Sequence, residues 1–190
     1  MTRREAVDIL TAELGSDRFA VFTTGMISRE AARADRPAHF YMVGSMGLAS
    51  SIALGVALAQ PGRPVVAVDG DGSALMNLGS LAMVAYHGPE RFLHVVLDNE
   101  AYESTGGQPS VSARTPLEAI ARAAGYRQAR RVASAEELAQ AVRELAAARG
   151  PAFLLVKVGI ESGAHPPRVP LSPAELRDRA RAFLARGAQA

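Results

Sequence analysis

The chain has 190 residues, of which 48% are hydrophobic and 21% charged, so it can bury the core of one globular domain. Its formal net charge is only +2 and its basic residues are scattered, which argues against a nucleic-acid-binding surface. It contains no cysteine, which excludes disulfides, thiolate zinc sites and iron–sulfur clusters held by this chain.

The N-terminal stretch MTRREAVDILTAEL has the pattern of an amphipathic helix and lacks the apolar segment of a signal peptide. The longest apolar stretch, residues 48–59, is too short to span a bilayer. We therefore expect a cytoplasmic protein with no membrane association.

Helix-like and strand-like segments alternate along the chain. Periodic apolar residues predict helices over 2–14, 26–34, 47–60, 73–87, 115–125, 134–150 and 172–187. Short apolar runs predict strands over 19–23, 39–43, 64–70, 91–99, 126–132 and 151–159, and the Gly-, Ser- and Thr-rich segment 100–115 is expected to be a loop. This alternation predicts a doubly wound α/β fold, a mostly parallel sheet with helices on both faces, formed by residues 1–190 as a single domain.

Two of the predicted strands end in oxygen-bearing side chains. The run VVAVDGDG places Asp71 between Gly70 and Gly72, and the run VVLDNEAY ends at Asn99. Glycines allow a bulky anion to approach the backbone, and the helix that follows would direct free N–H groups toward a phosphate. A carboxylate beside a phosphate requires a cation between them, and Mg²⁺ prefers such oxygen ligands. The stretch therefore predicts a metal–diphosphate site.

The GDG motif, followed after twenty-five residues by DN, resembles the cofactor-binding motif of thiamine-diphosphate enzymes. The stretches TTGMISRE, VGSMGLASSIALGVALAQPGRPVVAVDGDGSALMNLGSLA, DNEAYESTGGQPS and HPPRVPLSPAELRDR are most similar to the phosphonopyruvate and sulfopyruvate decarboxylases. The similarity covers nearly all of residues 20–180. It implies the diphosphate-binding domain of the thiamine-diphosphate fold, with thiamine diphosphate and Mg²⁺ as cofactors.

The resemblance also implies roles for individual residues. Mg²⁺ would be bound by the side chains of Asp71 and Asn99 and by the backbone carbonyl of Ala101, although Asp98 stands where the family often has a first Asn. Met46 would wedge the cofactor into its bent form, although a methionine can also simply fill a core. The implied cofactor-binding residues are Thr24, Gly25, Gly44, Ser45, Met46, Gly70, Gly72 and Ser73, and the weaker candidates for a substrate loop are Ser104, Thr105, Gly106 and Gln108.

Thiamine-diphosphate catalysis also requires a glutamate against the aminopyrimidine ring, which the family supplies from a pyrimidine-binding domain. We find no such domain in this sequence, and none of its glutamates has the required context. The resemblance therefore implies a β-type subunit, active only with an α-type partner that supplies this glutamate, in an assembly of at least α₂β₂. It would decarboxylate 3-sulfopyruvate or 3-phosphonopyruvate, small anionic 2-oxo acids, to CO₂ and an aldehyde. We also expect self-association through the exposed docking face.

Several alternatives stay open at this stage. The chain could belong to another split thiamine-diphosphate enzyme, a carboligase or a 2-oxo acid oxidoreductase, or it could be a non-catalytic scaffold relic. Glu103 could be a solvated loop residue or a site residue, and His165 with Arg168 could face an acidic substrate or a partner chain. We expect structural roles for the remaining conspicuous polar residues, with His39, His87 and His94 outside the chemistry and Arg29 and Glu30 in surface ion pairs.

Overall fold

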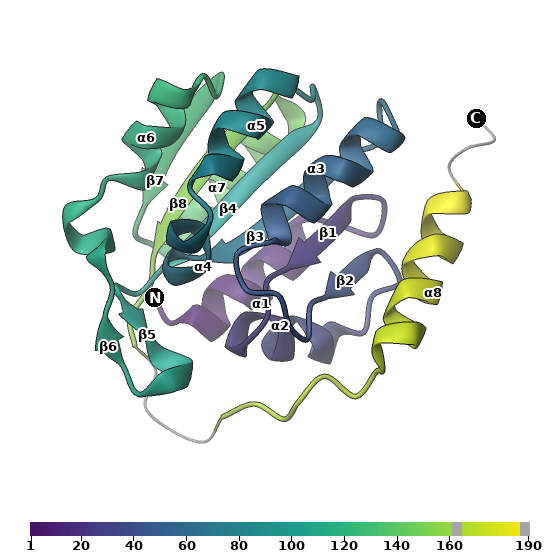
Figure 1. Ribbon diagram of the computed structural model, residues 1–190, viewed down its shortest axis with the longest axis horizontal. Coiled ribbons are helices and arrows are strands. Elements are labelled where there is room, and N and C mark those ends of the chain that lie inside the picture. Colours follow the sequence, from purple (N-terminus) through teal and green to yellow (C-terminus); the bar gives the residue numbers. More distant parts are fainter. Residues whose placement is uncertain (161–164, 187–190) are drawn as a thin grey trace.

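A parallel sheet forms the centre of the molecule in the computed structural model, which describes residues 1–160 and 165–186 (Figure 1). Each pair of neighbouring strands in this sheet runs parallel. The strand order is β2 (His39–Tyr41), β1 (Phe19–Phe22), β3 (Val65–Gly70), β4 (Phe92–Asp98), β8 (Ala152–Lys157) and β7 (Gln128–Val132). The predicted α/β class and parallel pairing are confirmed.

Helices cover both faces of the sheet, so the central strands read as continuous apolar runs; all seven residues of β4 are buried. One face carries α1 (Arg3–Glu13), α2 (Met26–Ala31) and α7 (Ala135–Ala147). The other carries α3 (Ala49–Ala59), α5 (Gly79–His87) and α6 (Leu117–Ala124). The last helix, α8 (Pro173–Ala185), packs beside β2 at the edge of the sheet, and Gly187 of the predicted helix lies outside the described residues.

The helix starts follow local sequence signals. Thr2, Ser134 and Ser172 accept a hydrogen bond from the backbone of the glutamate three residues later, and that glutamate bonds back to the cap. Each such capping box satisfies N–H groups that the first helical turn leaves free. The described residues include no helix that is both long and apolar enough to cross a membrane.

The helix predicted over residues 73–87 is wrong as a single element. It begins earlier, as α4 (Asp71–Met76), and breaks before α5. Asn77 has φ −141° and ψ 53°, outside the helical region, and its amide donates to the carbonyl of Gly47 over 2.9 Å. The break thus ties the start of this unit to the loop between β2 and α3.

The segment predicted as a loop over residues 100–115 contains regular structure. Strands β5 (Ala101–Tyr102) and β6 (Gln108–Pro109) pair antiparallel, and short 3₁₀ helices occupy Glu103–Thr105 and Val111–Arg114. Gly106 and Gly107 have positive φ values, so the reversal between the two strands needs their conformational freedom. The hairpin stands beyond the end of β4 and helps to shape the site.

Candidate functional site

A cavity of about 270 Å³ opens at the carboxyl ends of β1 and β3. The chain leaves β1 toward β2 on one side and leaves β3 toward β4 on the other, so this is the point where strand order reverses and where such folds bind ligands. We call it the main cavity. It is lined by Arg3, Thr23, Thr24, Gly25, Met26, Ile27, Arg29, Met46, Gly70, Asp71, Gly72, Ser73, Leu97, Asn99, Ala101, Tyr102, Glu103, Ser104, Thr105 and Val158.

Most residues predicted for the site meet around this cavity. From segments far apart in the sequence, the fold brings together Thr24, Gly25, Met46, Gly70, Asp71, Gly72, Ser73, Asn99, Ala101, Ser104 and Thr105. Four predicted residues do not line it. Gly44 and Ser45 lie on the exposed loop after β2, Gly106 is exposed in the hairpin, and the amide of Gln108 donates to the carbonyl of Thr105 over 3.0 Å. The binding roles of all these residues remain predictions.

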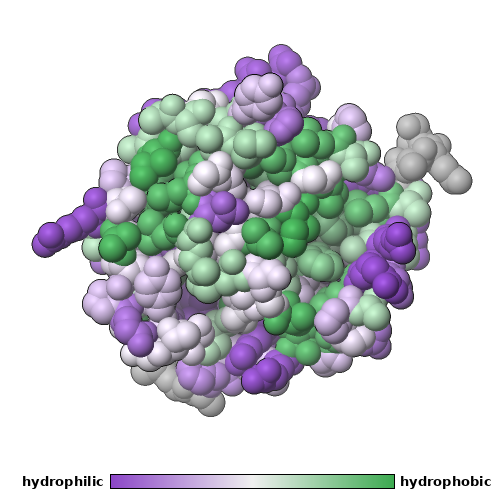
Figure 2. Space-filling view, in the orientation of Figure 1, coloured by the Kyte–Doolittle hydropathy of each residue, from purple (hydrophilic) through white to green (hydrophobic). Residues whose placement is uncertain are grey.

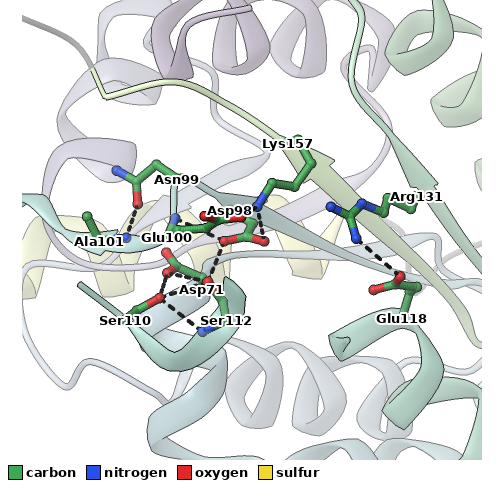
Figure 3. A network of polar contacts seen from close by, with 10 residues as sticks. All are labelled: Asp71, Asp98, Asn99, Glu100, Ala101, Ser110, Ser112, Glu118, Arg131 and Lys157. Atoms are coloured by element: carbon green, nitrogen blue, oxygen red, sulfur yellow. Dashed lines mark hydrogen bonds and ion pairs between the residues drawn. The ribbon is translucent and has the colours of Figure 1, made fainter. Parts of the chain in front are cut away.

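Asp71 is the buried carboxylate of the main cavity, with 3% of its surface exposed. Its Oδ2 accepts hydrogen bonds from the hydroxyl of Ser110 and, over 3.2 Å, from that of Ser112 (Figure 3). Burial raises the pKa of Asp71 above its ordinary value, and the bond from Ser110 opposes that rise. A cation beside this carboxylate would favour its charged form.

Asn99 and Ala101 occupy one tight turn at the end of β4. The side-chain oxygen of Asn99 accepts the N–H of Ala101 over 3.1 Å, and its Nδ2 donates to Glu103 over 2.9 Å. The amide oxygen keeps a second lone pair, and the neighbouring backbone adds carbonyl oxygens. Within the described parts of the chain, no three His, Cys, Asp or Glu side chains group as a metal site. The donors thus fit a hard cation that takes a few protein oxygens and completes its shell with phosphate oxygens.

A polar network that sequence reasoning missed supports these two strand ends. Asp98 accepts from the hydroxyl of Ser112 over 2.7 Å and from the ammonium of Lys157 over 2.7 Å (Figure 3). Burial alone would lower the pKa of Lys157, but hydrogen bonds to Asp98 and Glu100 outweigh it and raise that pKa. The serines lie beyond the hairpin and Lys157 ends β8, so no local sequence signal connects them to Asp71.

A second buried chain of hydrogen bonds holds the turn that follows β3. The hydroxyl of Ser73 bonds to Asp69 Oδ1 over 2.5 Å, lies 2.8 Å from the hydroxyl of Thr23 and accepts the N–H of Gly47 over 3.0 Å. Asp69 Oδ2 lies 3.0 Å from Nε2 of His94, whose Nδ1 lies 3.2 Å from the hydroxyl of Tyr126. The Ser73 side chain therefore fastens the turn, and its backbone N–H is the group left for an anion. His94 has the structural role expected for it.

Glu30 corrects a prediction, because it is not in a surface pair. It is 1% exposed and forms a bidentate ion pair with Arg3, with bonds of 2.9 and 3.0 Å. Arg3 also pairs with Glu103, whose side chain is only 11% exposed, so Glu103 is a residue of the main cavity rather than a solvated one. The pair forms because α1 packs against α2, a contact that the sequence pattern of either helix does not specify.

Gly72 is required by close packing. A Cβ at this position would lie 2.5 and 2.8 Å from ring atoms of Tyr102 and 3.3 Å from Cε of Met46. The turn therefore approaches both side chains as closely as a backbone can. Any larger residue would push Tyr102 or Met46 within the cavity.

Comparison with known proteins identifies the family of this chain. Residues 23–156 match the family described as "Thiamine pyrophosphate enzyme, C-terminal TPP binding domain". The phosphonopyruvate decarboxylase of Streptomyces viridochromogenes is 47% identical over 186 residues, which cover 96% of this chain and 46% of that protein. The sulfopyruvate decarboxylase subunit beta of Methanococcus maripaludis is 39% identical over 94% of this chain and 95% of its own length.

Solved structures agree on the fold. The thiamine diphosphate-dependent 4-hydroxybenzoylformate decarboxylase of Rhodococcus jostii superposes with a TM-score of 0.71 at 21% identity, over 86% of this chain and 33% of that one. The chain spans about half the length of the phosphonopyruvate decarboxylases that it matches. It belongs to the thiamine pyrophosphate enzymes, whose C-terminal TPP-binding domain it carries, and it is related to the phosphonopyruvate and sulfopyruvate decarboxylases.

Proposed function

We propose that this chain is the diphosphate-binding part of a thiamine-diphosphate-dependent decarboxylase that converts 3-sulfopyruvate or 3-phosphonopyruvate to CO₂ and the aldehyde. The main cavity carries the proposal. It joins the GDGS turn after β3 to the Asn99–Ala101 turn after β4 at the strand-order reversal. Relatives bearing the two decarboxylase names support the two candidate substrates.

Different residues would contact the metal ion, the diphosphate and the ring system of the cofactor. Asp71, Asn99 and the carbonyl of Ala101 would bind Mg²⁺, and the backbone N–H groups of Gly72 and Ser73 would donate to the diphosphate. Met46, 37% exposed and on the wall of the main cavity, would support the bent cofactor from below. When bound, thiamine diphosphate supplies the sink for the electron pair left by departing CO₂.

The activating glutamate would come from a pyrimidine-binding partner, an α-type subunit. A relative of nearly equal length named as a subunit beta supports this arrangement. Exposed apolar side chains also lie on the loop after β2, where Val43 is 49% and Leu48 is 44% exposed beside Met46. A partner seated on this loop would exclude water from the main cavity, which strengthens electrostatic interactions inside it.

A wider apolar surface supports self-association. Met76, Met83 and Tyr86 are 62%, 52% and 84% exposed. Figure 2 shows apolar surface, in green, over the face where α3, α4 and α5 lie in Figure 1. We expect the chain to form at least dimers in size-exclusion chromatography with light scattering, and charged substitutions at Met83 and Tyr86 to shift it toward the monomer.

Calorimetric titration tests cofactor binding. Thiamine diphosphate should bind the wild-type chain with Mg²⁺ and at least about tenfold more weakly with excess chelator, because the ion offsets repulsion between carboxylate and phosphate. Asp71→Ala should lose the Mg²⁺-dependent part of the affinity. Asp17→Ala removes a carboxylate whose side chain is 70% exposed and should bind as the wild type does. Equal affinity of Asp71→Ala and wild type would contradict the metal assignment.

Activity measurements test the reaction itself. The chain should decarboxylate sulfopyruvate or phosphonopyruvate only after a pyrimidine-binding subunit is added. Substantial turnover by the isolated chain would refute the need for a partner. Acyloin formation with an added aldehyde, without net release of free aldehyde, would point to a carboligase instead.

A further inference from the structure

A second cavity, of about 260 Å³, adjoins the main cavity. The two share Thr24, Gly25 and Arg29 in their walls, so the turn after β1 lies between them. We call it the arginine cavity. Its lining is Thr24, Gly25, Arg29, Met42, Val43, Arg168, Val169, Leu171 and Pro173, which includes two arginines and no acidic residue.

The two arginines reach this cavity from separate parts of the fold. Arg29 lies in the last turn of α2 and is half-buried. Arg168 lies on the extended segment between β8 and α8, which crosses below α2 in Figure 1. Val169 and Leu171 pack against the core on that face, which fixes the segment in place. The backbone at both arginines is therefore held by packed neighbours, while the side chain of Arg168 is exposed.

The charges of these arginines are not balanced within the described residues. No side-chain hydrogen bond or ion pair joins either one to a described residue, whereas Arg33 pairs with Asp8 and Arg179 with Asp35. The rest of the arginine cavity is mainly apolar, with Met42 4% and Val43 49% exposed. Two free guanidinium groups beside an apolar wall form a site for a compact anion.

We propose that the arginine cavity binds the tetrahedral anionic group of the substrate, a phosphonate or sulfonate, while the 2-oxo acid end reaches the main cavity. The proposal rests on the function proposed above and names the residues that select its substrate. In the main cavity Arg3 is paired with Glu30 and Glu103, whereas Arg29 and Arg168 have no described ion-pair partner, so the anionic tail would pair with these two arginines. The planar fork of each guanidinium matches the oxygens of a tetrahedral group.

Binding of unreactive probes to the full chain tests the site independently of catalysis. Phosphonoacetate and sulfoacetate carry the tetrahedral group without a keto carbon, and malonate carries a second carboxylate in its place. In titration calorimetry, Arg29→Gln and Arg168→Gln should each weaken phosphonoacetate or sulfoacetate binding at least about tenfold, the effect of a lost charge-assisted pair. Arg181→Gln removes an exposed arginine of α8 outside both cavities and should leave it unchanged.

Several results of this titration would overturn the proposal. The first is that neither probe binds the wild type measurably, and the second is that malonate binds as tightly as both probes. The third is that Arg181→Gln loses as much probe affinity as the cavity variants, which would indicate an effect of net charge alone. Circular dichroism and thermal unfolding of each variant establish that it is folded. If the glutamine variants unfold, Arg29→Lys and Arg168→Lys replace them. Each should then lose less probe affinity than a glutamine variant would, but still more than Arg181→Gln.

Kinetics of the enzyme assembled with its partner separate this proposal from the proposed function. The ratio of kcat/KM for phosphonopyruvate or sulfopyruvate to that for pyruvate should fall at least about tenfold in each glutamine variant. The fall should come from a higher KM for the anionic substrate, with kcat nearly unchanged. If the wild type decarboxylates and this ratio is unchanged, the arginine assignment is wrong and the proposed function stands. If the wild type does not decarboxylate but the probes bind through both arginines, the proposed function is wrong and the anion site stands.

Discussion

Substitution of His94 by phenylalanine tests the buried chain that holds the turn after β3. His94 is fully buried, and its ring bonds to Asp69 on one side and Tyr126 on the other. His94→Phe keeps a flat ring of similar size in contact with Phe153, whose centroid lies 5.2 Å away. It leaves the carboxylate of Asp69, itself 1% exposed, with Ser73 as its remaining partner.

The expected cost follows from that burial. Leaving a buried polar group without its hydrogen-bond partner costs about 1–3 kcal/mol, and more for a charged group such as a carboxylate, because the group stays desolvated. The hydroxyl of Tyr126 loses its bond to the His94 ring as well, and a buried unpaired hydroxyl adds about 1–3 kcal/mol. We expect His94→Phe to lower the free energy of unfolding by at least about 3 kcal/mol.

Urea denaturation followed by circular dichroism measures this cost, and two further variants control it. His87→Phe makes the same chemical change at an exposed helix end and should shift stability by less than about 0.5 kcal/mol. The double variant Asp69→Leu with His94→Phe removes the stranded charge and should recover at least about 1 kcal/mol relative to the sum of the single changes. A loss below 1 kcal/mol in His94→Phe, or additive single costs, would refute the reasoning.

Three other outcomes are expected. Gly72→Ala should lower the free energy of unfolding by about 1 kcal/mol and weaken thiamine diphosphate binding in calorimetry, since overpacking costs about 1–3 kcal/mol. Gly79→Ala, in α5, where an added Cβ meets no other atom within 4 Å, should be neutral or stabilising. Burial, with the charges of Arg36 and Arg179, lowers the pKa of His39 from 6.5 to about 4, so stability present above pH 6.5 is lost as pH falls toward 4. Between pH 7 and 4.5, urea denaturation should show the wild type losing about 2–3 kcal/mol more than His39→Phe does; equal losses would contradict this pKa. Chelation of divalent ions should lower the thermal stability gained from thiamine diphosphate without changing that of the chain alone, as differential scanning fluorimetry would show.

Local sequence signals predicted the elements that depend on local physics. The buried runs that form β3 and β4 and the capping box at Ser134 each lie within a few consecutive residues. Their apolar pattern and residue types were therefore enough to predict them. The sequence likewise indicated that Asp71 and Asn99 end neighbouring strands, because parallel strands place their carboxyl ends at one edge of the sheet.

Features that depend on contacts between distant segments were not predictable. The helical period continues through Asn77, but the helix breaks where the side-chain amide of this residue donates to the carbonyl of Gly47, thirty residues away, and to the hydroxyl of Ser51. Glu30 has the sequence context of a surface residue until α1 brings Arg3 over it. The bonds from Ser110 and Ser112 to Asp71 require the hairpin to fold back across the end of β4. In each case a tertiary partner decided an outcome that local propensity left open.

The wall shared by the two cavities bears on how such enzymes diversify. The residues that would anchor the cofactor, Asp71 and Asn99, lie at strand ends inside the stretch that matches the family, residues 23–156. Arg168 lies on a strap beyond that stretch and outside the sheet. Under the proposed assignment, substitutions in this segment would alter which acid is accepted and leave the sheet and the cofactor-binding residues unchanged. In the proposed arrangement the two sets of residues lie on different segments except at Thr24, Gly25 and Arg29, which line both cavities.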